Sequence, residues 1–266
     1  AVFGPLLVTP AQWAGRTWFG LATYSGPWLV SSVFLVLAAI NTAVRLRPDP
    51  LVVSGSQAKV PTRMGVVAAF RLITSTGNGR LALAAMVVSQ ATMVAVMTMT
   101  PVHLKLHGYE NVSPYVISLH IAGMFAFSPL VGKYADHYGR VNAIFFGAVL
   151  LVVATALSAV SGEGNPMLFP SLWLLGIGWN FGLIGGSSLL VESIDDSVRV
   201  RVQGTADLLM SFCGGLAGFS SGFVRRAIGF HLLSTASLVL AGVLLVYVIA
   251  GSAHTRPTVE SLLRRR

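Results

Sequence analysis

The sequence predicts an all-α membrane protein, a multi-helix transmembrane bundle in a partial chain with about seven to eight membrane-spanning helices. Charged residues make up only 10% of the 266 residues, whereas hydrophobic residues make up 54%. The mean hydropathy is +0.75. Apolar runs long enough to cross the roughly 30 Å hydrocarbon core of a bilayer recur along the whole chain. A soluble fold of this size would need a more polar surface than this composition supplies.

Seven segments are each long and apolar enough to span a bilayer as a helix of about 20 residues. They cover residues 27–44, 81–104, 114–131, 141–160, 167–191, 204–224 and 228–250. An eighth apolar segment, residues 1–15, has the look of a helix that is cut short. The chain begins without methionine and without a basic leader, so we expect a fragment of a longer protein whose N-terminal helices are missing.

The net charge of +9 is concentrated in alternate connections between the apolar segments. One set of connections and the C-terminal tail contain Arg45, Arg47, Lys59, Arg63, Arg71, Arg80, Lys133, Arg140, Arg199, Arg201, Arg256, Arg264, Arg265 and Arg266. The opposite set contains only Arg16, Lys105, Arg225 and Arg226. This bias follows the positive-inside rule and predicts that the linker and the C-terminus are cytoplasmic. The positive charge therefore reflects topology, and we expect no nucleic-acid partner.

Four regions follow from these patterns. We expect residues 1–44 to end an N-terminal bundle, 45–80 to form a cytoplasmic linker, 81–250 a C-terminal six-helix bundle, and 251–266 a basic cytoplasmic tail. Within the linker, residues 62–73 place Val66, Val67, Phe70 and Ile73 on one helical face, which suits a helix lying on the inner leaflet. An ordinary linker helix without a function of its own is the alternative.

A polar hairpin of the pattern GxxxDxxGR separates two of the apolar segments, with Gly132, Asp136, Gly139 and Arg140 at the fixed positions. Gly139 can adopt positive φ, and Gly132 permits the close approach of a neighbouring helix. Asp136 offers a carboxylate to a helix N-terminus, whereas Arg140 can pair with an acidic group from another helix. Such contacts hold only while the helices are close, so they form a conformational latch.

The hairpin resembles the signature cytoplasmic loop of the major facilitator superfamily, which recurs between the eighth and ninth helices of that family. The resemblance implies a bundle of the major facilitator type, of which this chain covers the end of the fifth helix to the twelfth. The glycine-rich segment 176–182, followed by Glu192, resembles the tenth helix of bacterial drug-exporter-like members. By that resemblance Glu192 would pair with Arg140. The alternative is a solvated acidic loop containing Glu192, Asp195 and Asp196.

Polar side chains at membrane depth are costly, so each is a candidate for solute or proton binding, with helix packing as the rival explanation. The predicted substrate cavity contains Gln90, Met93, Met97, His120, Trp173, Asn180 and Ser187. His120 is also a candidate for proton coupling because histidine titrates near neutral pH. Asp207 is the other candidate, although a carboxylate near a helix start also stabilises the helix dipole.

These features predict a secondary active permease that works by alternating access, with proton-coupled export of a small, partly apolar solute. Its partners would be that solute, the lipid bilayer and a coupling proton, and we expect no cofactor. One alternative is a truncated remnant or partner protein without transport. Another is an integral membrane enzyme or a metal-binding membrane protein built on His103, His107 and Glu110, but no convergent catalytic or metal-ligand set is apparent.

Overall fold

The computed structural model describes residues 2–22, 24–48, 53, 64–161 and 166–254, and every element in this part of the chain is a helix. The chain divides into two compact units, Ala1–Arg63 and Met64–Arg266. Each unit has its own packing. The all-α architecture expected from composition is confirmed.

The first unit is a helical pair. It contains the 3₁₀ turn η1 (Pro5–Leu7), α1 (Val8–Phe19) and α2 (Ser25–Arg45). The two helices cross at Ala11 and Gly26, where a Cβ on Gly26 would lie only 2.0 Å from the Ala11 carbonyl oxygen. Only a glycine therefore permits this crossing.

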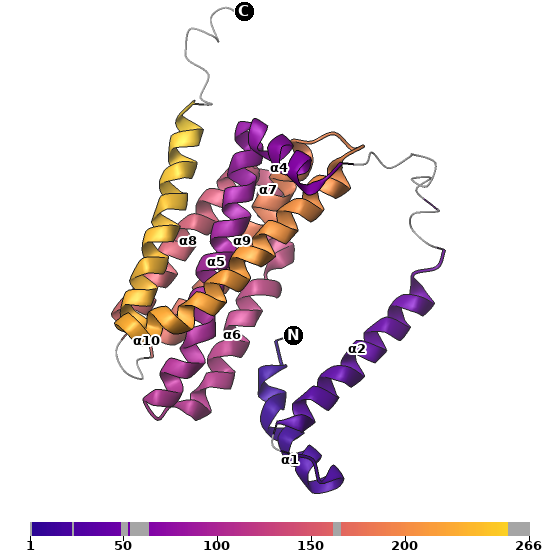
Figure 1. Cartoon of the computed structure of the whole chain (residues 1–266), viewed down its shortest axis with the longest axis vertical. Helices are drawn as coiled ribbons and strands as arrows, with labels where there is room; N and C mark the ends of the chain where they lie inside the picture. Colours follow the sequence, from indigo (N-terminus) through magenta and orange to yellow (C-terminus); the bar gives the residue numbers. More distant parts are fainter. Residues whose placement is uncertain (1, 23, 49–52, 54–63, 162–165, 255–266) are drawn as a thin grey trace, which may run out of the picture. The chain divides into compact units, whose positions relative to one another are not determined.

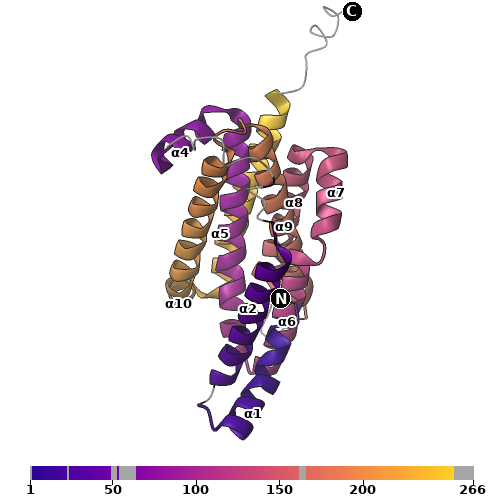
Figure 2. The same ribbon diagram turned by 90° about the vertical axis from the view of Figure 1, so that its right-hand side faces the viewer.

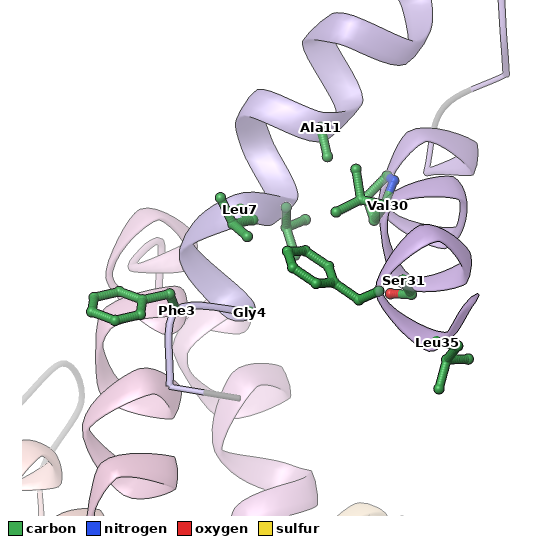
Figure 3. Close-up of a pocket in the computed structure, with 10 residues that line it drawn as sticks. Phe3, Gly4, Leu7, Ala11, Val30, Ser31 and Leu35 are labelled. Carbon is green, nitrogen blue, oxygen red and sulfur yellow. The ribbon is translucent and has the colours of Figure 1, made fainter. Parts of the chain in front are cut away.

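A cavity of about 610 Å³ opens between α1 and α2 (Figure 3). Its lining side chains are apolar apart from Ser31, and Figure 3 shows Leu7, Val30 and Leu35 around it. Because no charged group lines this cavity, the polar residues singled out in the sequence lie elsewhere, in the second unit.

The second unit is a helical bundle (Figure 1). Its elements are α4 (Val66–Ser75), α5 (Gly77–Leu106), η3 (Glu110–Val112), α6 (Ser113–Phe125), α7 (Ser128–Tyr138), α8 (Arg140–Val160), α9 (Leu168–Glu192) and α10 (Arg199–His254). The helix α9 packs against both α5 and α8, and it lies between them in the view of Figure 2. Glycines allow this central position, because an added Cβ on Gly182 would lie 2.0 Å from Ser89 Oγ of α5.

Six helical stretches among the described residues are long and apolar enough to cross a membrane. The sequence predicted seven, and the difference lies in α10, which contains both 204–224 and 228–250. Gly229 interrupts this helix with φ 83° and ψ 171°, a conformation open to glycine. Figure 1 shows the chain reversing direction within α10, from the orange half to the yellow half. Two helices thus meet at Gly229, and they correspond to the two separate crossings that the sequence predicted.

The stretch predicted as one helix over 114–131 is broken. α6 ends at Phe125 and α7 begins at Ser128, because Pro129 lacks the N–H that would continue the hydrogen-bond ladder. α7 then continues to Tyr138, so the polar motif is not a hairpin loop. Its first seven residues, 132–138, form the end of a helix, and Gly139 alone makes the turn, with φ 95° and ψ 154°.

The short helix α4 packs on α5 and α10 with one face. Ala69 and Ile73 are buried there, whereas Val66, Val67 and Phe70 are exposed. The sequence placed Ile73 on the same face as the three exposed side chains. Of these four residues only Ile73 is buried, beside Ala69 one turn before it, where α4 packs on α5 and α10.

Candidate functional site

A cluster of three charged side chains lies where α7, α8 and α9 meet, which we call the hairpin end of the bundle. Arg140 Nη1 lies 2.6 Å from Asp136 Oδ1. Arg140 Nη2 and Nε both lie 2.8 Å from Glu192 Oε1. The turn at Gly139 makes Arg140 the first residue of α8, and the guanidinium thereby reaches the last residue of α9.

The exposure of the cluster is uneven. The side chain of Arg140 is 21% exposed, that of Glu192 53% and that of Asp136 72%. Exposed ion pairs of this kind contribute about 0–1 kcal/mol each. The cluster therefore holds the helix ends together weakly, as an interaction that is made and broken reversibly.

A second cavity, of about 590 Å³, adjoins the cluster. It is lined by the start of α5, with Thr76, Gly77 and Asn78, and by the end of α9. Thr76 caps α5, since its hydroxyl accepts a hydrogen bond from the Gly79 amide at 3.0 Å. Glu192 thus contacts Arg140 and also faces a hollow at the hairpin end.

Two members of the predicted latch differ from expectation. The carboxylate of Asp136 contacts the guanidinium of Arg140, four residues later across the turn at Gly139, rather than the backbone amides of a helix N-terminus. At Gly132 an added Cβ would meet no atom within 4 Å in the described part of the chain, so no close helix contact accounts for this glycine. Gly139 has the positive φ that the motif predicted.

At mid-depth, Gln90 of α5 contacts two other helices. Its Oε1 accepts a hydrogen bond of 2.6 Å from Trp179 Nε1 of α9. The ring of Trp179 in turn packs edge-on against Phe125 of α6, with ring centroids 5.9 Å apart. We call Phe125, Trp179 and Gln90 the aromatic–amide triad.

Asn180 is buried, and both ends of its amide contact the break between α6 and α7. Its Oδ1 accepts from Ser128 Oγ at 3.3 Å, and its Nδ2 lies 3.5 Å from the Gly123 carbonyl oxygen. In this conformation Asn180 therefore satisfies interrupted backbone rather than facing an open cavity.

His120 is fully buried against α9. Its Nδ1 lies 2.7 Å from the Leu172 carbonyl oxygen, which fixes the proton on Nδ1 because a carbonyl can only accept. Its Nε2 is enclosed and has no hydrogen-bond partner among the described residues. The side chain thus has one orientation and one unused acceptor atom.

The remaining predicted residues lie at different depths and exposures. Met93 is buried and Met97 is half-buried, while Trp173 is half-buried and packs edge-on against Phe127 at 5.9 Å. Ser187 is half-buried on α9. Asp207 is exposed and accepts a hydrogen bond of 2.9 Å from Gln203.

The helix that contains Asp207 begins earlier than the sequence indicated. α10 starts at Arg199, which places Asp207 about 12 Å along the helix axis at 1.5 Å per residue. The dipole effect is confined to the first turn, so a capping role does not fit Asp207.

The proposed metal ligands do not converge. His103 and His107 lie with ring centroids 4.4 Å apart, but Glu110 forms an ion pair of 3.3 Å with Lys105 instead. Among the described residues no group of three His, Cys, Asp or Glu side chains could hold a metal ion.

The sequence analysis missed three residues that form these contacts: Phe125, Ser128 and Trp179. Trp179 next to Asn180 was a usable signal, because a buried indole N–H needs an acceptor. Pro129 inside an apolar run was the signal for the break that Ser128 and Asn180 stabilise.

The apolar helices, the interrupted span and the charged cluster at one end are those of an all-α integral membrane protein. The model of the Major Facilitator Superfamily matches residues 1–222. The chain belongs to the Major Facilitator Superfamily.

Curated relatives agree with this assignment. The chain is 36% identical over 256 residues to "Uncharacterized MFS-type transporter YddS" and 34% identical over 254 residues to "Uncharacterized MFS-type transporter YdeG", both of Bacillus subtilis (strain 168). It is 28% identical over 254 residues to "Riboflavin transporter RfnT" of Brucella anthropi. Each match covers 94% of this chain but only 58%, 59% and 60% of the respective relative. No solved structure matches the chain.

Proposed function

We propose that the protein is a secondary active transporter of the bacterial plasma membrane that exports a small, partly apolar solute in exchange for protons. Membership of the Major Facilitator Superfamily supports transport. The contact of Arg140 with both Asp136 and Glu192 is the observation that supports the mechanism. In this proposal the hairpin end is cytoplasmic, and the cluster closes that end during alternating access.

The cluster suits a latch because it joins different helices through ion pairs that each contribute little free energy. Arg140 starts α8 and Asp136 lies in α7, whereas Glu192 ends α9, so a displacement of α9 relative to the turn at Gly139 breaks the Arg140 contacts to Glu192. At about 1 kcal/mol for an exposed pair, the latch biases a conformational equilibrium roughly fivefold without locking it.

The solute would bind at mid-depth, beside the aromatic–amide triad and the half-buried Met97. Methionine and aromatic surfaces suit a partly apolar solute, and one amide supplies polarity. One relative is named a riboflavin transporter, so flat heteroaromatic compounds are the first solutes to test.

Proton coupling is proposed for Asp207 and His120. Asp207 is an exposed carboxylate on a membrane-spanning helix, and an ionisable side chain at such a position marks a functional site by default. His120 has a free acceptor atom but is enclosed, so its protonation would require α6 and α9 to move apart.

The test is solute flux in vesicles containing the protein expressed from its complete coding sequence, with radiolabelled riboflavin as the first probe and an imposed pH gradient. We expect Glu192→Gln and Asp136→Asn to change the transport rate by about two- to fivefold, as the loss of an exposed ion pair predicts.

Glu110→Gln is the matched control, because it neutralises an exposed ion pair at the other end of α5. Unchanged flux in both latch variants would refute the latch. Loss of flux in the Glu110→Gln control to the same extent would show that any surface charge has the same effect. An absence of pH dependence for a transported solute would refute proton exchange.

A further inference from the structure

We propose that Trp179 fixes Gln90 as a hydrogen-bond donor, so that the cavity selects flat aromatic solutes that contain a hydrogen-bond acceptor, such as a carbonyl group. This inference rests on the proposed solute cavity and names the chemical class that the cavity would select.

The two side chains lie at the same depth in antiparallel helices. Gln90 is 13 residues from Gly77, the start of α5, and Trp179 is 13 residues from Glu192, the end of α9 (90 minus 77 and 192 minus 179). Those two helix ends line one cavity at the hairpin end. At 1.5 Å per residue both side chains lie about 20 Å inside the bundle, near the middle of a bilayer of about 30 Å hydrocarbon thickness plus interfaces.

The hydrogen bond between them has only one possible direction. An indole N–H donates and has no lone pair to accept, so the atom of Gln90 that lies 2.6 Å from Trp179 Nε1 must be the carbonyl oxygen. The amide cannot flip without leaving the buried indole N–H without an acceptor, which costs about 1–3 kcal/mol. Trp179, at 7% exposure, therefore holds the amide in one orientation.

This orientation leaves the amide nitrogen for another molecule. In the part of the chain that the structure describes, Gln90 Nε2 donates to no acceptor, and it is absent from the enclosed polar atoms. A lone NH₂ group in a membrane-spanning region is costly unless water, another protein segment or a solute accepts its hydrogen bonds. The triad thus presents the two N–H groups of the amide, while the amide oxygen already accepts the hydrogen bond from Trp179.

The amide side chain of Gln90 also lies close to α10. A Cβ on Gly214 of α10 would lie 2.7 Å from Gln90 Cγ and 3.0 Å from Nε2. The side chain of Gln90 therefore lies directly against α10, in the space that the absent side chain of Gly214 leaves.

The neighbouring surface favours a flat ring. Phe125 is 49% exposed and packs edge-on with Trp179, so part of its ring remains uncovered next to the residue that holds the amide. Aromatic pairs of this geometry contribute about 0.5–1.5 kcal/mol beyond their buried area. Met97, seven residues after Gln90 on the same helical face, adds a flexible apolar wall.

A matched series of three tricyclic probes tests the inference. Fluorenone contains a carbonyl acceptor, fluorene contains no hydrogen-bonding group, and carbazole contains only an N–H donor, while all three have nearly the same size. Binding to the purified protein in detergent is measured with tritiated fluorenone and competition by the other two. We expect fluorenone to bind about fivefold more tightly than fluorene or carbazole, the value of one net hydrogen bond.

Two variants locate the effect. In Gln90→Leu the preference for fluorenone should vanish, and in Trp179→Phe it should fall to less than twofold because the amide is then free to turn. Trp28→Phe, at an exposed position of α2, is the matched control and should keep the preference. The readout is the ratio of two affinities measured on the same protein. A loss of folded protein reduces the binding of both probes equally and leaves this ratio unchanged.

Equal affinity of the wild-type protein for fluorenone and carbazole would overturn the inference, as would a full preference in Trp179→Phe. Either result leaves the transport proposal intact if the latch variants still alter flux. Conversely, a fluorenone preference in a protein without flux would support the site and refute the transport proposal.

Discussion

Gly176 is the position where one added methyl group has the most predictable effect. An alanine Cβ there would lie 2.3 Å from the His120 carbonyl oxygen and 3.1 Å from the Met124 amide nitrogen. Both are backbone atoms of α6, so no side-chain rotation relieves the overlap. The substitution Gly176→Ala therefore forces α6 and α9 apart.

The size of the effect follows from the geometry. An ordinary contact begins at 3.4 Å, so the helices must separate by about 1.1 Å at this point. Overpacking of a close contact costs about 1–3 kcal/mol, and a rigid backbone overlap belongs at the upper end. The higher helix propensity of alanine offsets about 1 kcal/mol of this loss of stability. We expect a net loss of about 2 kcal/mol, which lowers the melting temperature by about 4–8 °C.

The assay is thermal unfolding of the purified protein in mild detergent, followed by circular dichroism. Gly242→Ala is the control, because its added Cβ meets nothing within 4 Å and the same change in helix propensity should raise the melting temperature by about 2–4 °C. A Gly176→Ala protein that melts at or above the wild-type temperature would refute the close contact of α6 and α9.

The same melting assay tests three other contacts. Asn180→Ala removes the partner of Ser128 at the helix break and should cost about 1–3 kcal/mol, because buried polar groups lose their hydrogen bonds. Thr76→Ala removes the cap of α5 and should cost about 1 kcal/mol. Gly139→Ala should cost about 1–3 kcal/mol because its φ of 95° strains an alanine, whereas Gly132→Ala, in an open helical position, should not destabilise. A variant that melts with the wild type contradicts the contact it removes.

The architecture was predictable because lipid imposes a simple requirement on sequence. The low charge and the repeated apolar runs were sufficient to predict a helical membrane bundle, and the family assignment agrees with this prediction. Hydropathy predicted the two crossings on either side of Gly229, but it did not indicate that this one residue makes the turn between them. It also placed the end of the span at 131, although α7 continues through Asp136 to Tyr138.

The site was less accessible to sequence reasoning. The family resemblance implied that Glu192 would lie beside Arg140, and the two side chains are in contact in the structure. Partners that depend on three-dimensional packing could not be read from spacing, because Gln90 and Trp179 are 89 residues apart and meet only when α5 and α9 pack. For the same reason Asn180 was expected to face a cavity, whereas its amide contacts the α6–α7 break.

The single-residue reversal at Gly229 limits how the last two crossings can move. Because the connection between the two helices is a single glycine, their ends at Gly229 cannot move apart. Any change in the angle between the helices must therefore separate them most at the ends farthest from Gly229. His231 adds to this anchorage, because its Nδ1 lies 3.1 Å from the Ala159 carbonyl oxygen at the end of α8. The two helices can therefore separate only at the ends that lie away from Gly229, which include the start of α10 at Arg199.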